Sequence, residues 1–420
     1  MLFNSTIEKD FTYEILVSAE VILIKHSSYS KLLLLEPSGS NLCLEIEDNI
    51  LSTLSFKDKR LAHSVLGVLK VDQFNILLYV SESEFVGTIK ESKIFRIKEV
   101  GFLPICNEVL FANSKQETKD SINGIRNMLT TGFYYSFDYD LSNSFNKQPN
   151  DKNFAPNINY YWNYAISKVF IQNNISPIFM TIVICGYVGV SNPIDLSSLN
   201  VNLYLISRRN TNMPGTKHNC KGIDEFGNSA NFLETEQILQ ANKRIFTFLI
   251  YRGHPMVFYK KNKHETKLIL IDKPDDLYEN SIIKHIEAIT SSNNQNIFVL
   301  NLLSDYSTPE IEISQHFKCD LLPNKTLKKK MIQYLKYECK ADIESKDYIK
   351  VESFINNMLE NDHFMNTIQY YLEDNKKVCM MQKGVFRVNC FNSLDRTNIM
   401  QTAICWKIIE NQVSIYVNNI

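Results

Sequence analysis

The sequence lacks several features that mark common protein classes. Its 420 residues carry a formal net charge of −1, which argues against general nucleic-acid binding. Its nine cysteines include no Cys-x2-Cys pair, so we predict neither a zinc site nor a disulfide framework, and expect reduced cysteines in an intracellular protein. The longest apolar run, at 177–190, is interrupted by polar residues and glycines and is shorter than the roughly 20 residues of a membrane helix. Met1–Phe11 is typical of neither a signal peptide nor a transit peptide.

The composition that remains is that of a globular protein with two or three domains, 44% hydrophobic and 22% charged. Up to about residue 110 the chain alternates short apolar stretches with turn residues, which predicts an antiparallel, partly open sheet. The stretches are Glu14–Ile24, Lys31–Glu36, Leu42–Ile46, His63–Val71, Phe74–Val80 and Lys93–Val100. A connecting helix is expected at Glu117–Thr131.

From about Ile175 the pattern changes to longer strands and helices, so we predict a β-rich unit at 1–174 and an α/β unit at 175–420. The run Pro177–Val190 is expected to form a pair of buried strands. Further strands are expected at Leu203–Ser207, Thr247–Tyr259 and Asn296–Leu303, the last of them parallel and buried, and helices at Lys325–Glu338 and Tyr348–Leu359.

The segment Gln382–Gln401 predicts a strand, a tight loop and the start of a helix. Val385–Val388 is apolar and follows a glycine, whereas apolar residues recur at three- and four-residue spacing after Thr397, as on one face of a helix that ends near Glu410. Thr397 or Asn398 is a candidate cap for this helix.

Cys390 and Arg396 lie at the two ends of that loop, with five residues between them. A loop of this length before a helix can turn its amide N–H groups inward and form an anion site of phosphate size. The arginine would add a planar fork for two phosphate oxygens, and the same field would favour a thiolate on the cysteine. A thiolate beneath a bound phosphate can attack in line to give a phosphocysteine. The spacing alone is weak, and a buried structural cysteine near a surface arginine is the alternative.

A second polar stretch carries several cations among glycines and polar residues, which is typical of a loop presented to a ligand. The cations are Arg208, Arg209, Lys217, His218 and Lys221. We expect this patch to face a charged headgroup or an anionic membrane; a solvated surface run is the alternative. Lys328–Lys330 is expected to be a solvated helix face, with a membrane contact as the alternative.

The loop segment resembles the active-site segment of the Sac-domain phosphoinositide phosphatase family, which includes the N-terminal domain of synaptojanin. The family pattern is roughly Gly-Val-x-Arg-Thr-Asn-Cys-x-Asp-Cys-Leu-Asp-Arg-Thr-Asn. This chain departs from it at Val388, Asn392 and Ser393, and it matches at Gly384, Val385, Arg387, Asn389, Cys390, Leu394, Asp395, Arg396, Thr397 and Asn398.

Further segments resemble the same family in the same order along the chain. They are Gly132–Ser144, Tyr160–Asn163, Ile206–Arg209, Gly215–Asp224, Asn228–Gln237, Arg252–Tyr259 and Asn296–Leu303. The resemblance implies an α+β or α/β fold, in which an N-terminal β-rich Sac domain packs on an α/β catalytic domain with the Cys-x5-Arg phosphate-binding loop. It also implies hydrolysis of phosphate monoesters on inositol lipids with no metal and no other cofactor.

The expected roles follow from this resemblance and from the loop chemistry. Cys390 is the nucleophile, while Arg396 and the backbone N–H groups of Phe391–Arg396 hold the phosphate. Thr397 is placed to bond the thiolate or to assist its release. The general acid is left open, because Asn392 stands where the family has aspartate; Asp395 is one candidate, with Asp224 and Glu236 as remoter ones. Substrate contacts are expected from Asn392, Ser393, Leu394, Arg208, Arg209, Lys217 and Lys221.

The expected function is therefore a phosphatidylinositol phosphate phosphatase acting on a phosphate at position 4 or 3. A weakened or inactive lipid-binding scaffold is the main alternative, and a phosphatase for proteins or soluble inositol phosphates is a third. The expected partners are inositol phospholipids, an anionic membrane surface and an adaptor protein, with no nucleic acid. We expect a cytoplasmic protein, peripheral to an endomembrane.

Overall fold

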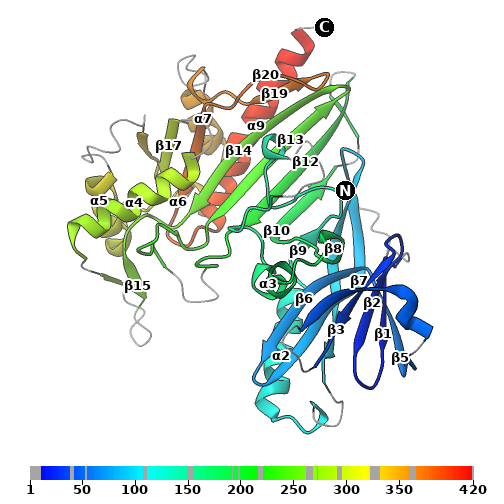
Figure 1. Ribbon diagram of the computed structural model, residues 1–420. Helices are drawn as coiled ribbons and strands as arrows, with labels where there is room; N and C mark the ends of the chain where they lie inside the picture. Colours follow the sequence, from blue (N-terminus) through cyan, green and yellow to red (C-terminus); the bar gives the residue numbers. More distant parts are fainter. Residues whose placement is uncertain are drawn as a thin grey trace. The chain divides into compact units, whose positions relative to one another are not determined.

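The computed structural model describes residues 11–37, 42–52, 54–106, 111–148, 155–191, 193–196, 199–215, 221–261, 268–271, 273–290, 296–321, 332–359 and 366–418. The chain forms two compact units, Met1–Gly189 and Val190–Ile420. In Figure 1 the first runs from blue to green and the second from green to red. Sheets and helices are mixed in the way expected of an α+β fold. The division at residue 174 that the sequence favours stays a prediction.

The first unit begins with a five-stranded antiparallel sheet in the order β4-β3-β2-β1-β5. The expected single strand at Glu14–Ile24 is wrong, because Ser18 closes a turn there: its hydroxyl accepts the N–H groups of Glu20 and Val21 at 3.2 and 2.9 Å. The strands are β1 (Tyr13–Val17), β2 (Ile22–His26), β3 (Lys31–Leu35), β4 (Cys43–Glu47) and β5 (Asp58–Ala62).

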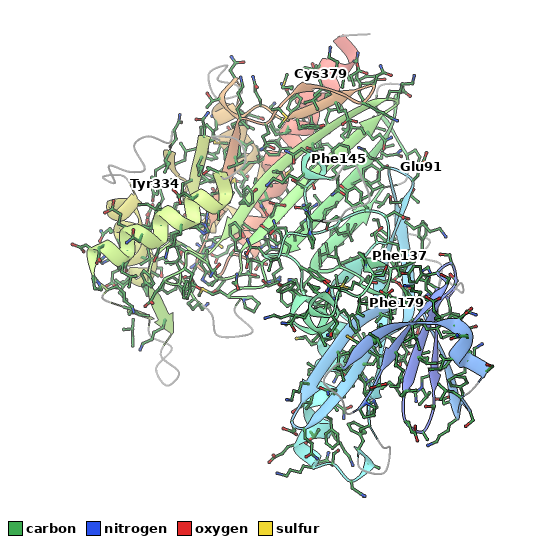
Figure 2. All side chains as sticks on the ribbon, viewed as in Figure 1. Glu91, Phe137, Phe145, Phe179, Tyr334 and Cys379 are labelled. Atoms are coloured by element: carbon green, nitrogen blue, oxygen red, sulfur yellow. The ribbon has the colours of Figure 1, made fainter. Side chains whose placement is uncertain are left out.

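A second antiparallel sheet of this unit follows the order β10-β9-β8-β7-β6. Its strands are β6 (Ser64–Val71), β7 (Phe74–Ile89), β8 (Ser92–Pro104), β9 (Phe133–Tyr135) and β10 (Val183–Val190). Aromatic side chains fill its core, where Phe95 stacks on Tyr135 and Phe137 packs edge-on against Tyr135. Figure 2 labels Phe137 and, in the neighbouring cluster, Phe179.

Two helices, α2 (Gln116–Leu129) and α3 (Tyr164–Gln172), accompany the second sheet. Before α3, the buried side chain of Asn163 joins three segments: its amide donates to the carbonyls of Leu66 and Thr181, both at 2.8 Å, and its oxygen accepts the N–H of Val183 at 2.9 Å. The expected strand pair at 177–190 is wrong, because a 3-10 turn, η3 (Pro177–Phe179), precedes the single strand β10. The other short turns of this unit are η1 (Asp48–Ser52) and η2 (Phe145–Lys147).

The second unit is built on a mixed sheet in the order β18-β17-β21-β14-β13-β12. One half is antiparallel: β12 (Leu199–Arg209), β13 (Leu233–Ala241) and β14 (Arg244–Gly253). The other half is parallel, as β14 pairs with β21 (Gly384–Asn389), β21 with β17 (Asn296–Asn301) and β17 with β18 (Ile332–Lys336). The predicted buried parallel strand at 296–303 is thereby confirmed. The predicted helix at 325–338 is wrong for its described part, which is β18; Lys328–Lys330 lies outside the described residues.

Helices cover both faces of the parallel strands because successive strand residues point to opposite sides. Phe298 and Phe386 enter a cluster with α7 (Tyr348–Leu359) and α9 (Asp395–Asn418). Ile297 and Val385 enter another with α4 (Asp275–Thr290) and α5 (Thr308–Leu321). The start and end predicted for α7 are confirmed, but α9 begins two residues before Thr397 and continues past Glu410, so the predicted caps are wrong.

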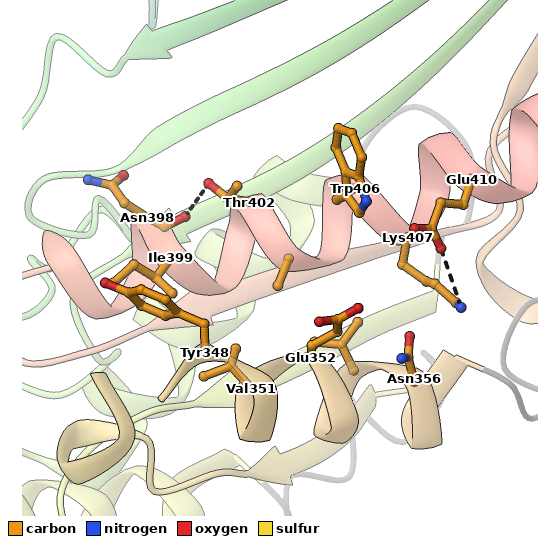
Figure 3. A pocket seen from close by; sticks show the side chains of 12 residues that line it. Tyr348, Val351, Glu352, Asn356, Asn398, Ile399, Thr402, Trp406, Lys407 and Glu410 are labelled. Atoms are coloured by element: carbon orange, nitrogen blue, oxygen red, sulfur yellow. Dashed lines mark hydrogen bonds and ion pairs between the residues drawn. The ribbon is translucent and has the colours of Figure 1, made fainter. Parts of the chain in front are cut away.

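Helices α7 and α9 leave an apolar groove of about 480 Å³ between them, lined by Tyr348, Val351, Ile355, Ile399 and Trp406 among others (Figure 3). The remaining short elements of the unit are β11 (Ile194–Leu196), β15 (Tyr259–Lys261), β16 (Leu268–Leu270), α6 (Lys340–Glu344), β19 (Tyr371–Asp374) and β20 (Lys377–Met380).

The buried amide of Asn163 gives a first prediction. We expect Asn163→Ala to lower the free energy of unfolding by about 3 kcal/mol, because each buried polar group left without a partner costs roughly 1–3 kcal/mol. Urea unfolding followed by circular dichroism measures the change. The control is Asn127→Ala on the exposed face of α2, which should stay within about 0.5 kcal/mol of wild type. Equal losses in the two variants would contradict this account of the contact.

Candidate functional site

The loop Cys390–Leu394 joins the end of β21 to the first residue of α9. Because β21 lies between two parallel neighbours, β14 and β17, the loop stands at the carboxyl edge of these strands, where open α/β sheets bind ligands. Cys390 is 2% exposed and Ser393 is fully buried. Ser393 has a φ of 51°, in the left-handed region, which gives the loop its tight bend.

The carbonyl groups of the loop are bonded by side chains from other segments. Tyr259 donates to the carbonyl of Phe391 at 3.2 Å, and the Asn231 amide donates to those of Asn392 and Ser393 at 3.1 and 2.8 Å. Arg252 adds a bond of 2.6 Å to the Ser393 carbonyl.

The C=O and the following N–H of a trans peptide point in opposite directions, so these bonds turn the loop amides away from Tyr259, Asn231 and Arg252. The N–H of Ser393 bonds back to the carbonyl of Cys390 at 3.3 Å. Other N–H groups find no acceptor in the described part of the chain: those of Phe391, Asn392, Leu394, Asp395, Arg396 and Thr397. Three of them belong to the first turn of α9, where helical N–H groups lack intrahelical partners and attract anions.

Cys390 lies in the field of three guanidinium groups. Burial lowers the pKa of Arg252 to about 10 and that of Arg387 to about 9, and a negative charge on Cys390 opposes both shifts. The same charge acts on Arg396. Arg387 is fully buried, and the groups that it bonds in the described part of the chain are neutral, namely Ser229, His285 and the carbonyls of Gly253, His254 and Val388. A buried cation is costly without a counter-charge, so this environment favours a bound anion.

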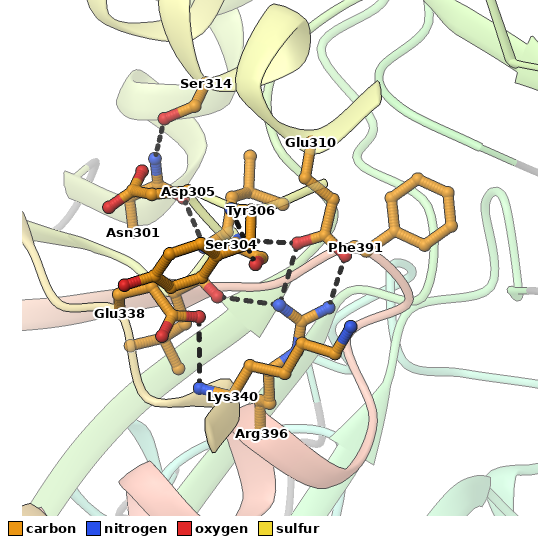
Figure 4. A network of polar contacts seen from close by, with 12 residues as sticks. Asn301, Ser304, Asp305, Tyr306, Glu310, Ser314, Glu338, Lys340, Phe391 and Arg396 are labelled. Carbon is orange, nitrogen blue, oxygen red and sulfur yellow. Dashed lines mark hydrogen bonds and ion pairs between the residues drawn. The ribbon is translucent and has the colours of Figure 1, made fainter. Parts of the chain in front are cut away.

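The guanidinium of Arg396 is already hydrogen-bonded within the protein. Its two terminal nitrogens bond the carboxylate of Glu310 at 2.8 and 3.0 Å, and one also donates to the carbonyl of Leu302 at 2.9 Å (Figure 4). The expectation of a fork dedicated to two phosphate oxygens is therefore corrected. A guanidinium has five N–H donors, so the Nε–H and one Nη2–H of Arg396 stay without an acceptor among the described residues.

The residues of the predicted cationic patch do not share one environment. Arg208 is fully buried between Glu234 and Glu236, at 3.1 and 2.7 Å. Its assignment to a ligand-facing patch is wrong, because these glutamates sit beside it on the paired strand β13. Arg209 donates to the carbonyl of Pro214 at 3.0 Å and to Asn231. Lys217 and His218 lie outside the described residues.

Lys221 does reach the loop. Its ammonium donates to the side-chain oxygen of Asn392 at 2.6 Å and lies 5.1 Å from the centre of the Phe391 ring. Thr397 is fully buried, and its hydroxyl donates to the carbonyl of Leu394 at 2.8 Å, so it secures the loop. Leu394 is 39% exposed.

The acid candidates differ in their surroundings. Asp224 accepts the N–H groups of Phe226 and Asn228 and stabilises its own turn. Glu236 is fully buried against Arg208. Asp395 is exposed in the first turn of α9. Of the three, Asp395 is the carboxyl beside the loop that no hydrogen bond or ion pair engages among the described residues.

Sequence reasoning missed several residues of the site: Asn231, Arg252, Tyr259, Glu310 and Arg387. Four of them lie in stretches that carry the family resemblance, which was the signal that could have found them. Glu310 gave no such signal, since it lies in the first turn of α5 and meets Arg396 only through the fold.

Comparison with known proteins identifies the relationship. The model of the SacI homology domain matches residues 63–344. This chain belongs to the SacI homology domain family. The Sac-domain chain is 27% identical over 377 residues to an uncharacterized protein of Schizosaccharomyces pombe, covering 85% of this chain and 60% of the relative.

Two further relatives carry functional names, and this chain covers a smaller share of each. Phosphatidylinositol-3-phosphatase SAC1 of Drosophila melanogaster is 24% identical over 355 residues, covering 81% of this Sac-domain chain and 57% of the relative. Human synaptojanin-2 is 24% identical over 412 residues, covering 90% and 26%. The chain thus spans 60% or less of the length of these relatives. In the ranges that the structure describes, no helix is both long and apolar enough to cross a bilayer.

Two buried histidines near the site give a prediction about pH. Burial lowers the pKa of both His254 and His285 to about 3, and the charge of Arg387 adds to the shift. In the unfolded chain these imidazoles return to their ordinary pKa of 6.5. Between pH 6.5 and 3 the unfolded state therefore binds protons that the folded state does not, so stability is full above pH 6.5 and falls as the pH drops through this window.

We expect His285→Gln to flatten this dependence. The variant should be less stable than wild type at pH 7.5 and should lose less stability down to pH 4, because one of the two protonation sites is gone. Urea midpoints measured for both proteins at half-unit steps of pH provide the test. Parallel curves for wild type and variant would show that burial of His285 does not contribute to the pH dependence.

Proposed function

We propose that this Sac-domain chain hydrolyses a phosphate monoester on the headgroup of an inositol phospholipid, with Cys390 as the nucleophile. The observation that supports it best is the loop of unpaired amides before α9, with Cys390 at its beginning and three guanidinium groups nearby. Its relatives in fruit fly and zebrafish are named phosphatidylinositol-3-phosphatases, which supports the choice of substrate class.

In the first step the Cys390 thiolate attacks phosphorus while the bond from phosphorus to the inositol oxygen breaks. The loop amides and the two remaining N–H donors of Arg396 stabilise the three equatorial oxygens. Glu310 and the Leu302 carbonyl fix the plane of that guanidinium, so its donors are oriented before substrate arrives. Asp395 gives its proton to the departing inositol oxygen.

In the second step water attacks the phosphocysteine, the sulfur–phosphorus bond breaks and the thiolate returns, releasing inorganic phosphate. Asp395, now ionised, accepts the proton of the water. We propose Asn392, Ser393 and Leu394 as the loop positions next to the substrate, and Lys221 as the cation that reaches the headgroup. The substrate we favour is phosphatidylinositol with its phosphate at position 4 or 3, presented by an anionic endomembrane surface to which the protein binds peripherally.

A second candidate function is a lipid-binding scaffold without turnover. Two observations favour it: Arg396 is engaged by a carboxylate, and Asn392 cannot supply a titratable proton. Binding of inositol lipids without release of phosphate would identify this alternative.

The thiol gives the decisive prediction. Wild type should release inorganic phosphate from vesicles that contain phosphatidylinositol 4- or 3-phosphate, and Cys390→Ser should abolish the release because a serine hydroxyl stays protonated at neutral pH. Malachite-green detection of phosphate measures both. The matched control is Cys379→Ser at an exposed cysteine, which should retain wild-type turnover. Equal release by wild type and Cys390→Ser would refute the mechanism.

Asn392→Asp tests whether an acid is limiting. General acid catalysis contributes roughly 10²–10⁴-fold, so we expect a faster enzyme. Lys221 lies 2.6 Å from the Asn392 side-chain oxygen, and an opposite charge favours the ionised carboxylate. The gain over wild type should therefore be larger at pH 5 than at pH 7. The control, Asn398→Asp, adds the same charge in the first turn of α9. A rate ratio of one at both pH values would show that the reaction does not need an acid at position 392.

A further inference from the structure

Asn231 is a buried residue between the end of β12 and the loop Cys390–Leu394. It is 1% exposed, has a φ of 50°, and its N–H donates to the carbonyl of Met213 at 3.0 Å. Its side-chain nitrogen donates to the carbonyls of Asn392 and Ser393. Its side-chain oxygen accepts a hydrogen bond from the guanidinium of Arg209. The amide thus joins the end of β12 to the loop after β21.

The direction of this amide depends on Arg209. An asparagine amide has a donor end and an acceptor end of nearly the same shape. Turned by half a rotation, Asn231 would set its oxygen against two carbonyl oxygens and its NH₂ group against a cation. A guanidinium has only donors, so it accepts one orientation: oxygen toward Arg209 and nitrogen toward the loop. Arg209 is itself fixed by the carbonyl of Pro214 at 3.0 Å.

The carbonyls that Asn231 bonds belong to the peptides whose N–H groups are those of Ser393 and Leu394. Because each peptide is planar and trans, fixing the carbonyl fixes the amide on the other side. Donors oriented before a charge arrives stabilise it without a cost of reorganisation. Of these two groups, the Leu394 N–H has no acceptor among the described residues, and the Ser393 N–H closes the loop on the Cys390 carbonyl at 3.3 Å. Loss of the Asn231 bonds would let both peptides rotate, which would turn the Leu394 donor away from the anion and open the loop.

We propose that Arg209 and Asn231 act as one positioning pair that orients the loop peptides for an anion. Neither residue touches the substrate. The proposal rests on the proposed function in taking a phosphate-like anion as the ligand of the loop. It gives Arg209 a different part from the headgroup contact expected from its sequence.

Tungstate, a tetrahedral oxyanion, is the probe, and its affinity is measured by calorimetry on the whole chain. Asn231→Asp keeps the shape and the acceptor for Arg209 but has no donor for the two carbonyls. We expect it to bind tungstate about 10- to 100-fold more weakly, and to lower kcat more than KM, in line with the roughly 10²–10³-fold effect of losing a preorganised donor. The control Asn210→Asp adds the same charge next to Arg209, and its carboxylate keeps the bond from the Asn212 N–H at 2.7 Å. It should bind within about twofold of wild type.

The pair is tested by a double-mutant cycle with Asn231→Ala and Arg209→Met. If Arg209 acts through Asn231, the double variant should lose no more affinity than the weaker-binding single variant. Arg209→Lys keeps a donor and a charge and should recover part of the affinity lost in Arg209→Met. Thermal unfolding must show that each variant is folded at the temperature of the titration.

The outcomes separate the proposals. Wild-type affinity in Asn231→Asp, or additive losses in the cycle, would overturn the positioning pair. Tungstate binding by wild type with no phosphate release from any inositol lipid would overturn the proposed function and leave the pair standing. Absence of tungstate binding to wild type would overturn both.

Discussion

Hydrogen bonds to the loop carbonyls decide where the loop amides point. Tyr259, Asn231 and Arg252 make these bonds from positions 132, 162 and 141 residues away from their acceptors. Because the two polar groups of a trans peptide lie on opposite sides, control of the carbonyls is control of the amides. The candidate anion site is therefore a product of tertiary structure, although the residues that form it are contiguous in the chain.

The parallel pairing of β14 with β21 supplies the frame for these contacts. In its register Arg252 lies beside Val388 and Gly253 beside Asn389, so the ends of the two strands are level. β17 continues the row, since Asn301 pairs with Asn389. Residues that follow the three strands consequently meet at one edge: Cys390 after β21, His254 after β14, and the Leu302 carbonyl, which bonds Arg396, after β17. Strand register thus brings together functional groups that are far apart in the sequence.

Sequence patterns predicted what depends on local periodicity and spacing. The strand at Val385–Val388, the parallel strand after Asn296 and the helix at 348–359 follow from apolar runs and helical spacing, and the loop that begins at Cys390 follows from the break in both. Contacts between side chains on neighbouring strands could not be predicted from these local patterns. Arg208 looked like part of a surface patch because Glu234 and Glu236 meet it only when β12 and β13 pair. Glu310 lies in a helix whose sequence carries no distinguishing motif, so the sequence did not indicate its contact with Arg396. The sequence also predicted a helix where the structure has β18.

Arg387 points to a further consequence of the architecture. Its guanidinium is fully buried, and the groups that it bonds carry no formal charge. An enclosed cation of this kind weakens the folded state, and an anion arriving at the loop relieves that weakness. The protein is then most resistant to denaturation when its loop is filled. On the proposed function, binding of a phosphate-like anion at the loop would therefore raise the free energy of unfolding.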